Sequence, residues 1–339
     1  MSDDAIEIDV AGWVERAKTD PTAYGQRQAA EITLNAIAMT APLNEKLILK
    51  GGILMGLAYN SPRQTADIDV SAILVAEDNV DEMIKDLLDS AFPGAAAKLG
   101  YPDLILKVHS VKKQPKHIEI EDAEFPALKL KIAFAQRGTK QEQALREGKA
   151  PGIIDLDISF NEPLRQIQIL ELTGGEELLA YGLVDLIAEK YRAMLQQVER
   201  NRNRRQDVYD LDRLIVEHEL NAEVRVQILD VFIEKCRSRH IEPTAASLQN
   251  PEVKARSGAN WDRGTERRTC LCARRKIRCG GDRACRCITT ALQFGGPFVG
   301  NSCVGFCRAA SDRLLAGAVR RDTRSLSGDA AQWCFSRLA

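Results

Sequence analysis

Two short segments of the chain alternate aspartate with branched apolar residues. The first runs from Asp67 through Ile68 to Asp69, and the second holds Asp155 and Asp157 at the same spacing. A period of two residues is typical of a β-strand, in which alternate side chains point to opposite faces. Each segment therefore predicts a strand with one apolar face in the core and one face that carries carboxylates.

The residues before the first acidic segment predict a strand, a glycine turn and a compact helix. Residues 46–49 are a short apolar strand, Gly51 and Gly52 follow it, and Leu54 and Leu57 have helical spacing. Because glycine has no Cβ, backbone N–H groups at the start of this helix could approach phosphate oxygens closely. Phosphate and metal ions could then share one site with the aspartates that follow.

The rest of the pattern predicts an α+β fold, in which a mixed sheet is followed by a helical domain. Helices are expected at residues 22–40 and 81–88, with a Pro- and Gly-containing link after the second. Strands are expected at 68–74, 104–108, 118–120, 128–134 and 153–160, with a polar, mobile loop at 137–151. Helical periodicity then covers 176–200, 207–219 and 222–237. We expect a first domain at residues 1–172 and a helical domain at 173–262.

Residues 263–339 form a third region of different composition. Residues 251–339 hold 17 Lys or Arg and 7 Asp or Glu, whereas residues 1–250 hold 30 and 41, so the net charge of -1 is a cancellation. Eight of the nine cysteines also lie in this last part. Zinc binding is one interpretation, but Cys-x-Cys is tighter than zinc-knuckle spacing and no histidine is present there. We favour a shift of reading frame near Asp262, because a GC-rich gene that is translated out of frame yields a sequence enriched in Arg, Cys, Gly, Ser and Ala.

Several classes of protein are excluded by the sequence. The start of the chain, residues 1–4, is acidic rather than basic, and no apolar run reaches the ~18 residues that span a bilayer, so a cytoplasmic chain without a membrane partner is expected. The four histidines are scattered, without zinc-enzyme spacing or a Ser-His-Asp signature. Hydrolase chemistry of these kinds is therefore not indicated.

The paired aspartates carry the chemistry. Carboxylates that face one side of a strand repel each other unless cations occupy the site or water screens it, and two-metal nucleotidyl transfer needs such a pair. A solvated edge strand is the alternative for Asp67 and Asp69 alone. The later strand could supply a third carboxylate, from Asp157 or Asp155, that completes metal binding and helps to deprotonate an attacking hydroxyl.

Several short motifs follow one another in order along the chain. They are Leu49-Lys50-Gly51-Gly52, Ser61-Pro62-Arg63 with Thr65, Asp67-Ile68-Asp69-Val70, Leu156-Asp157-Ile158, Ala188-Glu189-Lys190 with Arg192-Ala193, and Arg205-Gln206-Asp207-Val208-Tyr209-Asp210-Leu211. Together they resemble the AbiEii/AbiGii-type nucleotidyltransferase toxins, a branch of the DNA polymerase beta-like nucleotidyltransferase superfamily. The resemblance covers roughly residues 20–240.

This resemblance implies a two-lobed enzyme that moves a nucleoside monophosphate from a nucleoside triphosphate to an acceptor, with RNA such as tRNA as the leading acceptor. It implies that Mg²⁺ is held by the catalytic residues Asp67, Asp69 and Asp157. The nucleotide-binding residues that it implies are Lys50, Gly51, Gly52, Arg63, Thr65, Lys190, Asp207 and Asp210. It also implies a toxin of a toxin–antitoxin pair, with a cognate antitoxin protein as partner.

Each weaker member of this set has a structural alternative. Lys190 could be an ordinary surface lysine of an amphipathic helix, and Asp207 and Asp210 could form salt bridges with Arg204 or Arg205. Arg63 could bind a strand-end carbonyl instead of phosphate. For the whole protein, the alternatives are nucleotidylation of a protein or small-molecule hydroxyl, and a non-catalytic protein that binds an antitoxin or RNA.

Overall fold

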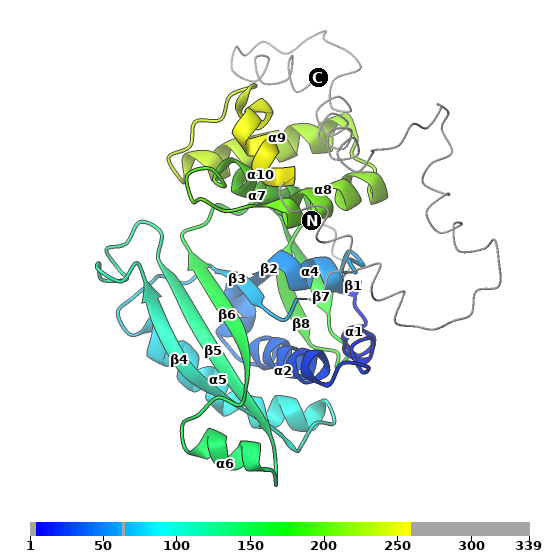
Figure 1. The fold of residues 1–339 in the computed structure, drawn as a ribbon, viewed down its shortest axis with the longest axis vertical. Helices are drawn as coiled ribbons and strands as arrows, with labels where there is room; N and C mark the ends of the chain where they lie inside the picture. Colours follow the sequence, from blue (N-terminus) through cyan, green and yellow to red (C-terminus); the bar gives the residue numbers. More distant parts are fainter. Residues whose placement is uncertain (1–4, 63–64, 259–339) are drawn as a thin grey trace, which may run out of the picture. The chain divides into compact units, whose positions relative to one another are not determined.

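A computed structural model describes residues 5–62 and 65–258 of the chain. Within them, an eight-stranded mixed sheet has the strand order β1-β7-β8-β2-β3-β6-β5-β4 (Figure 1). The strands are β1 (Ile6–Glu7), β2 (Leu47–Lys50), β3 (Ile68–Ala72), β4 (Leu104–Gln114), β5 (Ala127–Gln136), β6 (Gly152–Phe160), β7 (Ile167–Glu171) and β8 (Glu177–Tyr181). The α+β class with a mixed sheet, expected from the sequence, is confirmed.

The central strands of the sheet are the ones that the sequence marked with aspartates. β3 pairs antiparallel with β2 and parallel with β6, and β6 pairs antiparallel with β5. Their apolar residues are fully buried, as Ile68, Leu130 and Leu156 show. Because β3 has a neighbour on both sides, the alternative of a solvated edge strand for Asp67 and Asp69 is wrong.

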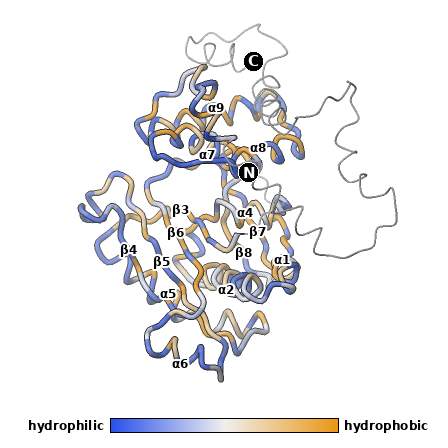
Figure 2. The backbone as a smooth tube through the Cα atoms, in the orientation of Figure 1, coloured by the Kyte–Doolittle hydropathy of each residue, from blue (hydrophilic) through white to orange (hydrophobic). Residues whose placement is uncertain are grey.

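Helices α2 (Pro21–Ala38) and α5 (Val80–Lys98) cover one face of this sheet (Figure 1). α2 begins where the sequence predicts, because Pro21 suits the first helical position and the Asp20 side chain accepts hydrogen bonds from the N–H groups of Thr22 (3.0 Å) and Ala23 (3.2 Å). The buried residues of α2 include Ile32. Figure 2 shows apolar and polar residues alternating along the helices and strands. The opposite face of the sheet is left for other groups.

The remaining helices are shorter or follow the sheet in sequence. They are α1 (Val10–Glu15), α3 (Leu43–Lys46), α4 (Gly51–Leu57), α6 (Lys140–Arg146), α7 (Leu183–Leu195), α8 (Arg205–Glu217), α9 (Ala222–Arg237) and α10 (Pro251–Gly258). Of the helices in the described residues, none is long and apolar enough to cross a membrane.

One expected helix, before β4, and one expected strand, between β4 and β5, differ from the structure. α5 continues through Pro93 to Lys98 instead of ending after residue 88, because Phe92 and Ala95 are buried and their packing outweighs the proline. Residues 118–120 are not a strand, since β4 itself extends to Gln114 and is followed by a loop. The apolar spacing of that loop misled the prediction.

Two further segments were also assigned wrongly. Residues 137–151 contain α6, which is capped by Thr139 and packs Leu145 against Ala133 and Ala135. The helix predicted from residue 176 begins only at Leu183, because β8 precedes it and pairs with β7 across a turn in which Gly175 has a φ of 79°. Both errors arise from tertiary packing that a local pattern does not contain.

Contacts divide the described chain into two compact units. The first comprises residues 5–192 and 217–242, and the second comprises 193–216 and 243–258. In the second unit, Gln197 donates hydrogen bonds to the Val253 carbonyl (2.9 Å) and the Ser257 hydroxyl (2.8 Å), which fixes α10. The domain boundaries expected at residues 172 and 262 stay predictions, and the region 263–339 lies outside the described residues.

Candidate active site

A row of charged side chains crosses four adjacent strands of the first unit. In the strand register, Lys50 lies opposite Asp69, Asp69 lies beside Asp157, and Asp157 lies opposite Lys129. Residues in register across a sheet project from the same face. Lys50, Asp69, Asp157 and Lys129 therefore form one charged row, and the face that carries it is called the site face below.

Two more aspartates project from the site face. Asp67 and Asp155 lie two residues before Asp69 and Asp157, and Asp155 is opposite Lys131 on β5. The Lys129 ammonium lies 2.8 Å from Asp157 Oδ2, and the Lys131 ammonium lies 3.1 Å from Asp155 Oδ1. Both aspartates of β6 thus join the site face, with Asp157 as the register neighbour of Asp69.

Gly51 meets the charged row from the start of α4. Its φ of 74° is in the left-handed region, where side chains are disfavoured, and a Cβ added there would lie 2.2 Å from Asp69 Oδ2. Glycine is therefore required twice, by the backbone and by the carboxylate that lies against it. Gly52 follows inside α4 and is buried.

The two aspartates of the Asp67–Asp69 segment have raised pKa values. Burial raises the pKa of Asp69 to about 6, the Lys50 ammonium opposes this shift, and the carboxylates of Asp157 and Asp67 add to it. Burial also raises the pKa of Asp67, and the carboxylates of Asp155 and Asp157 raise it further. Burial and the neighbouring carboxylates thus outweigh the lysines in setting the pKa values of these two aspartates.

This donor set fits a divalent cation in its chemistry. Carboxylate oxygens are the ligands that Mg²⁺ prefers, and a cation would favour the charged carboxylates against the burial and the carboxylate repulsion that raise the pKa values of Asp67 and Asp69. Within the described residues, no three acidic, histidine or cysteine side chains already converge as a metal-binding cluster.

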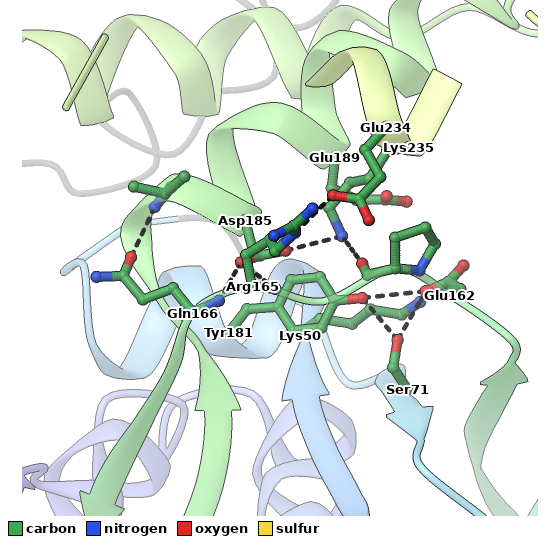
Figure 3. A network of polar contacts seen from close by, with 12 residues as sticks. Lys50, Ser71, Glu162, Arg165, Gln166, Tyr181, Asp185, Glu189, Glu234 and Lys235 are labelled. Atoms are coloured by element: carbon green, nitrogen blue, oxygen red, sulfur yellow. Dashed lines mark hydrogen bonds and ion pairs between the residues drawn. The ribbon is translucent and has the colours of Figure 1, made fainter. Parts of the chain in front are cut away.

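Lys50 belongs to a second, buried network centred on Glu162, which the sequence did not reveal. Glu162 Oε2 accepts hydrogen bonds from the Lys50 ammonium, Ser71 Oγ (2.6 Å) and the Tyr181 hydroxyl (3.1 Å), and its Oε1 lies 3.0 Å from Arg239 Nη2. Figure 3 shows Lys50, Ser71 and Tyr181 pointing toward this carboxylate. Burial alone would raise the pKa of Glu162, but the Lys50 ammonium and these hydrogen bonds lower it.

Lys190 of α7 is buried, with 5% of its surface exposed, so the alternative of an ordinary surface lysine is wrong. Its positive charge lowers the pKa of Asp69, which places it within electrostatic reach of the charged row. The neighbouring Glu189 forms an ion pair with Arg192; burial would raise the pKa of Glu189, but the charges of Arg192 and Lys50 lower it. Lys190 is thus a buried positive charge that acts on the Asp69 carboxylate.

The other predicted residues lie elsewhere or are less defined. Thr65 is half-buried in the segment before β3, and Arg63 lies outside the described residues. Asp207 and Asp210 lie on α8 in the second unit, where Asp207 Oδ2 is 3.6 Å from Arg204 Nη1 and Asp210 is buried. The salt bridge offered as an alternative for Asp207 is therefore present, and the nucleotide-binding role of these four residues stays a prediction.

Sequence reasoning also missed Lys129 as a partner of Asp157. Its signal was present, because Lys129 and Lys131 alternate with buried leucine and isoleucine in a predicted strand. Their pairing depends on the register between β5 and β6, which the sequence does not specify. Glu162 lies two residues after the end of β6, and nothing in the sequence around it predicted a role.

A strand, a pair of glycines and a helix precede carboxylates on two adjacent strands of the mixed sheet, an arrangement that suits metal-assisted transfer of a nucleotide. The model of the family described as "Nucleotidyl transferase AbiEii toxin, Type IV TA system" matches residues 32–267, and the chain belongs to this family. The resemblance noted from its motifs is confirmed.

Among solved structures, the MenT4 nucleotidyltransferase toxin from Mycobacterium tuberculosis H37Rv is similar to the chain. The TM-score is 0.44 with 16% sequence identity, and the match covers 70% of this chain and 74% of that chain. No curated protein matches the chain in sequence. The family assignment rests on the family model.

Proposed function

We propose that the chain transfers a nucleoside monophosphate from a nucleoside triphosphate to a hydroxyl of an RNA, with tRNA as the leading acceptor, and that Mg²⁺ is the metal used. Asp67, Asp69 and Asp157 would hold the metal. The observation that carries this proposal is the register that sets Asp157 beside Asp69, with Gly51 against the same carboxylate. As the toxin of its pair, the chain would bind a cognate antitoxin.

The bound metal would neutralise the triphosphate and orient its α-phosphate. In the reaction, the acceptor oxygen bonds to the α-phosphorus, the bond from that phosphorus to the bridging oxygen breaks, and pyrophosphate leaves. A site-face carboxylate, which we assign to Asp157, accepts the proton of the acceptor hydroxyl. This group is well placed because it projects beside Asp69 from the adjacent strand.

The other residues contribute through position and charge. Gly51 leaves room for the Asp69 carboxylate, and the backbone N–H groups of Gly51 and Gly52 at the start of α4 would bind a phosphate. The ammonium of Lys190, which already acts on Asp69, would balance charge on the leaving pyrophosphate. Lys50 is held by Glu162, so we assign its main role to supporting Asp69 electrostatically.

The test is label transfer from each of the four α-labelled nucleoside triphosphates in Mg²⁺ with total RNA, comparing wild type with Asp67→Asn. Label on RNA that is lost in Asp67→Asn would support the proposal and name the nucleotide. Label on protein or a small molecule would replace the RNA acceptor. Nucleotide binding without transfer of label to any acceptor would favour the non-catalytic alternative.

The cytoplasmic location expected from the sequence stays a prediction.

A further inference from the structure

Beyond Asp157, the charged row continues onto strands whose exposed side chains are basic. Lys112 on the edge strand β4 is in register with Lys129, and Ser110 is in register with Lys131. Lys107 pairs with Ala133, two residues from Lys131, so it projects from the same face. These four lysines, Lys107, Lys112, Lys129 and Lys131, are called the lysine strip.

The lysine strip is accessible. The side chains of Lys129 and Lys131 are 54% and 42% exposed, and Lys107 and Lys112 are also exposed. α2 and α5 pack on the other face of the sheet, and α6 covers only the far end of β5, at Ala133 and Ala135. Of the helices in the first unit, α6 thus lies at the Lys107 end of the strip, because Ala133 is the register partner of Lys107.

The charges of the lysine strip are only partly balanced. Lys129 and Lys131 pair with Asp157 and Asp155, whereas no described carboxylate lies within ion-pair distance of Lys107 or Lys112. If the aspartates bind a cation, the two paired lysines also lose their counter-ions. The strip would then present four positive charges directly beside the carboxylates, up to the acidic β4–β5 loop that contains Glu119 and Glu121.

The chemistry of this surface favours a phosphate backbone over a protein. Protein interfaces have an apolar or aromatic centre and are depleted in lysine, and the lysine strip offers no such centre. Phosphodiester contacts are made by lysine and arginine side chains, aided by hydroxyls such as that of Ser110. The strip also leads to Asp157, where a hydroxyl of the bound strand would have to arrive.

We propose that the lysine strip binds the sugar–phosphate backbone of the RNA acceptor and guides its hydroxyl to the site face. This inference rests on the proposed function, because it assigns the acceptor's path to that same site. It predicts binding without base specificity, since lysine contacts to phosphate carry no sequence information.

The test compares Lys107→Gln/Lys112→Gln with the control Lys18→Gln/Lys85→Gln, which removes the same charge from the turn after α1 and from α5. Lys18, Lys107 and Lys112 are exposed and the Lys85 side chain is 41% exposed, so both variants should fold. Binding of 5′-labelled bulk tRNA is measured by fluorescence anisotropy across a salt series. The strip variant should bind roughly tenfold more weakly at low salt, and the slope of log K against log salt should fall by about 1.5, as loss of two phosphate contacts requires. The control should match wild type.

Equal losses in both variants, or an unchanged slope in the strip variant, would overturn the inference. Poly-L-glutamate that displaces labelled tRNA from the wild-type protein as readily as unlabelled tRNA does would also overturn the inference, in favour of an acidic protein partner. If wild type transfers no label to RNA but the strip variant still loses slope, the transfer proposal fails while the binding surface stands.

Discussion

Glu162 and Asp69 both lie near Lys50, but their pKa values are shifted in opposite directions. Glu162 accepts hydrogen bonds from Lys50, Ser71 and Tyr181 and pairs with Arg239, and its pKa is lowered. Asp69 is also removed from water, but its neighbours include other carboxylates and its pKa is raised to about 6. The structure therefore completes one ionic network and leaves the other in need of positive charge.

This difference separates a structural group from a functional one. A buried ion pair that is fully hydrogen-bonded holds the fold, and removing one partner leaves the other charge buried and unpaired. A carboxylate whose charge is under-compensated costs stability, and such groups gather where a ligand supplies the missing charge. We therefore expect substitutions at Asp69 to act on chemistry and substitutions at Glu162 to act on folding.

The largest expected effect is on activity. Asp69→Asn should reduce nucleotide transfer by about 1,000-fold, or roughly 4 kcal/mol of transition-state stabilisation, because a metal ligand is lost. The free energy of unfolding should stay the same or rise, since carboxylate repulsion is relieved. Initial rates and urea unfolding measure both, with the exposed Asp78→Asn as the matched control. A large loss of stability in Asp69→Asn would erase the contrast with Glu162.

The next effect is on stability. Glu162→Gln should destabilise the fold by about 3–5 kcal/mol, because it leaves the buried charges of Lys50 and Arg239 without their carboxylate. Glu176→Gln, which breaks the more exposed pair with Lys98, should cost less than about 1 kcal/mol. Urea denaturation measures both. Equal effects would show that the Glu162 network is no more important than a surface pair.

The two carboxylates should also give opposite dependences of stability on pH. Because the pKa of Asp69 is raised to about 6, the folded state binds its proton more tightly than the unfolded state, and stability falls as pH rises from about 4 to 6, by roughly 2 kcal/mol. The pKa of Glu162 is lowered, so its stabilisation is present above its ordinary pKa and is lost as pH falls below it.

Unfolding curves between pH 3 and 7 for wild type, Asp69→Asn and Glu162→Gln resolve these two contributions. Asp69→Asn should remove the decline between about pH 4 and 6, whereas Glu162→Gln should flatten the acid limb. If both variants changed the same limb, the opposite environments assigned to the two groups would be wrong.

The smallest expected effect is steric. Gly51→Ala should destabilise the fold by about 1–2 kcal/mol through its positive φ, and should also displace Asp69 and lower the transfer rate, because the new Cβ would lie 2.2 Å from Asp69 Oδ2. Gly100→Ala is the matched control: Gly100 has a φ of 79°, but nothing lies within 4 Å of an added Cβ. It should lose similar stability and keep full activity. An equal loss of activity in both would argue against contact between Gly51 and Asp69.

Much of the fold was predicted from local patterns. The helix α2, the strands β2, β3 and β6, and the helix α9 lie within a few residues of their expected positions, because period and capping residues agree with the tertiary packing there. The errors fall where packing overrides the local signal. Pro93 lies inside α5, α6 occupies an expected loop, and β8 replaces the first turn of an expected helix.

The candidate site shows the same division. The period-two spacing of Asp67 with Asp69, and of Asp155 with Asp157, determined by itself that each pair would share a face of a strand with its carboxylates away from the core. Gly51 was recognised as special by its place between a strand and a helix, although its contact with Asp69 was not. The partners of these residues remained open.

Only the tertiary structure decided those partners. Asp69 meets Asp157 because β3 pairs in parallel with β6, and Lys129 meets Asp157 because β5 pairs with β6 in a register that joins distant segments. A slip of one residue would turn every side chain of a strand to the other face, so burial of the apolar faces fixes this register. The sequence thus determined which residues are charged and on which side of each strand they lie, while packing between strands decided which charges face one another.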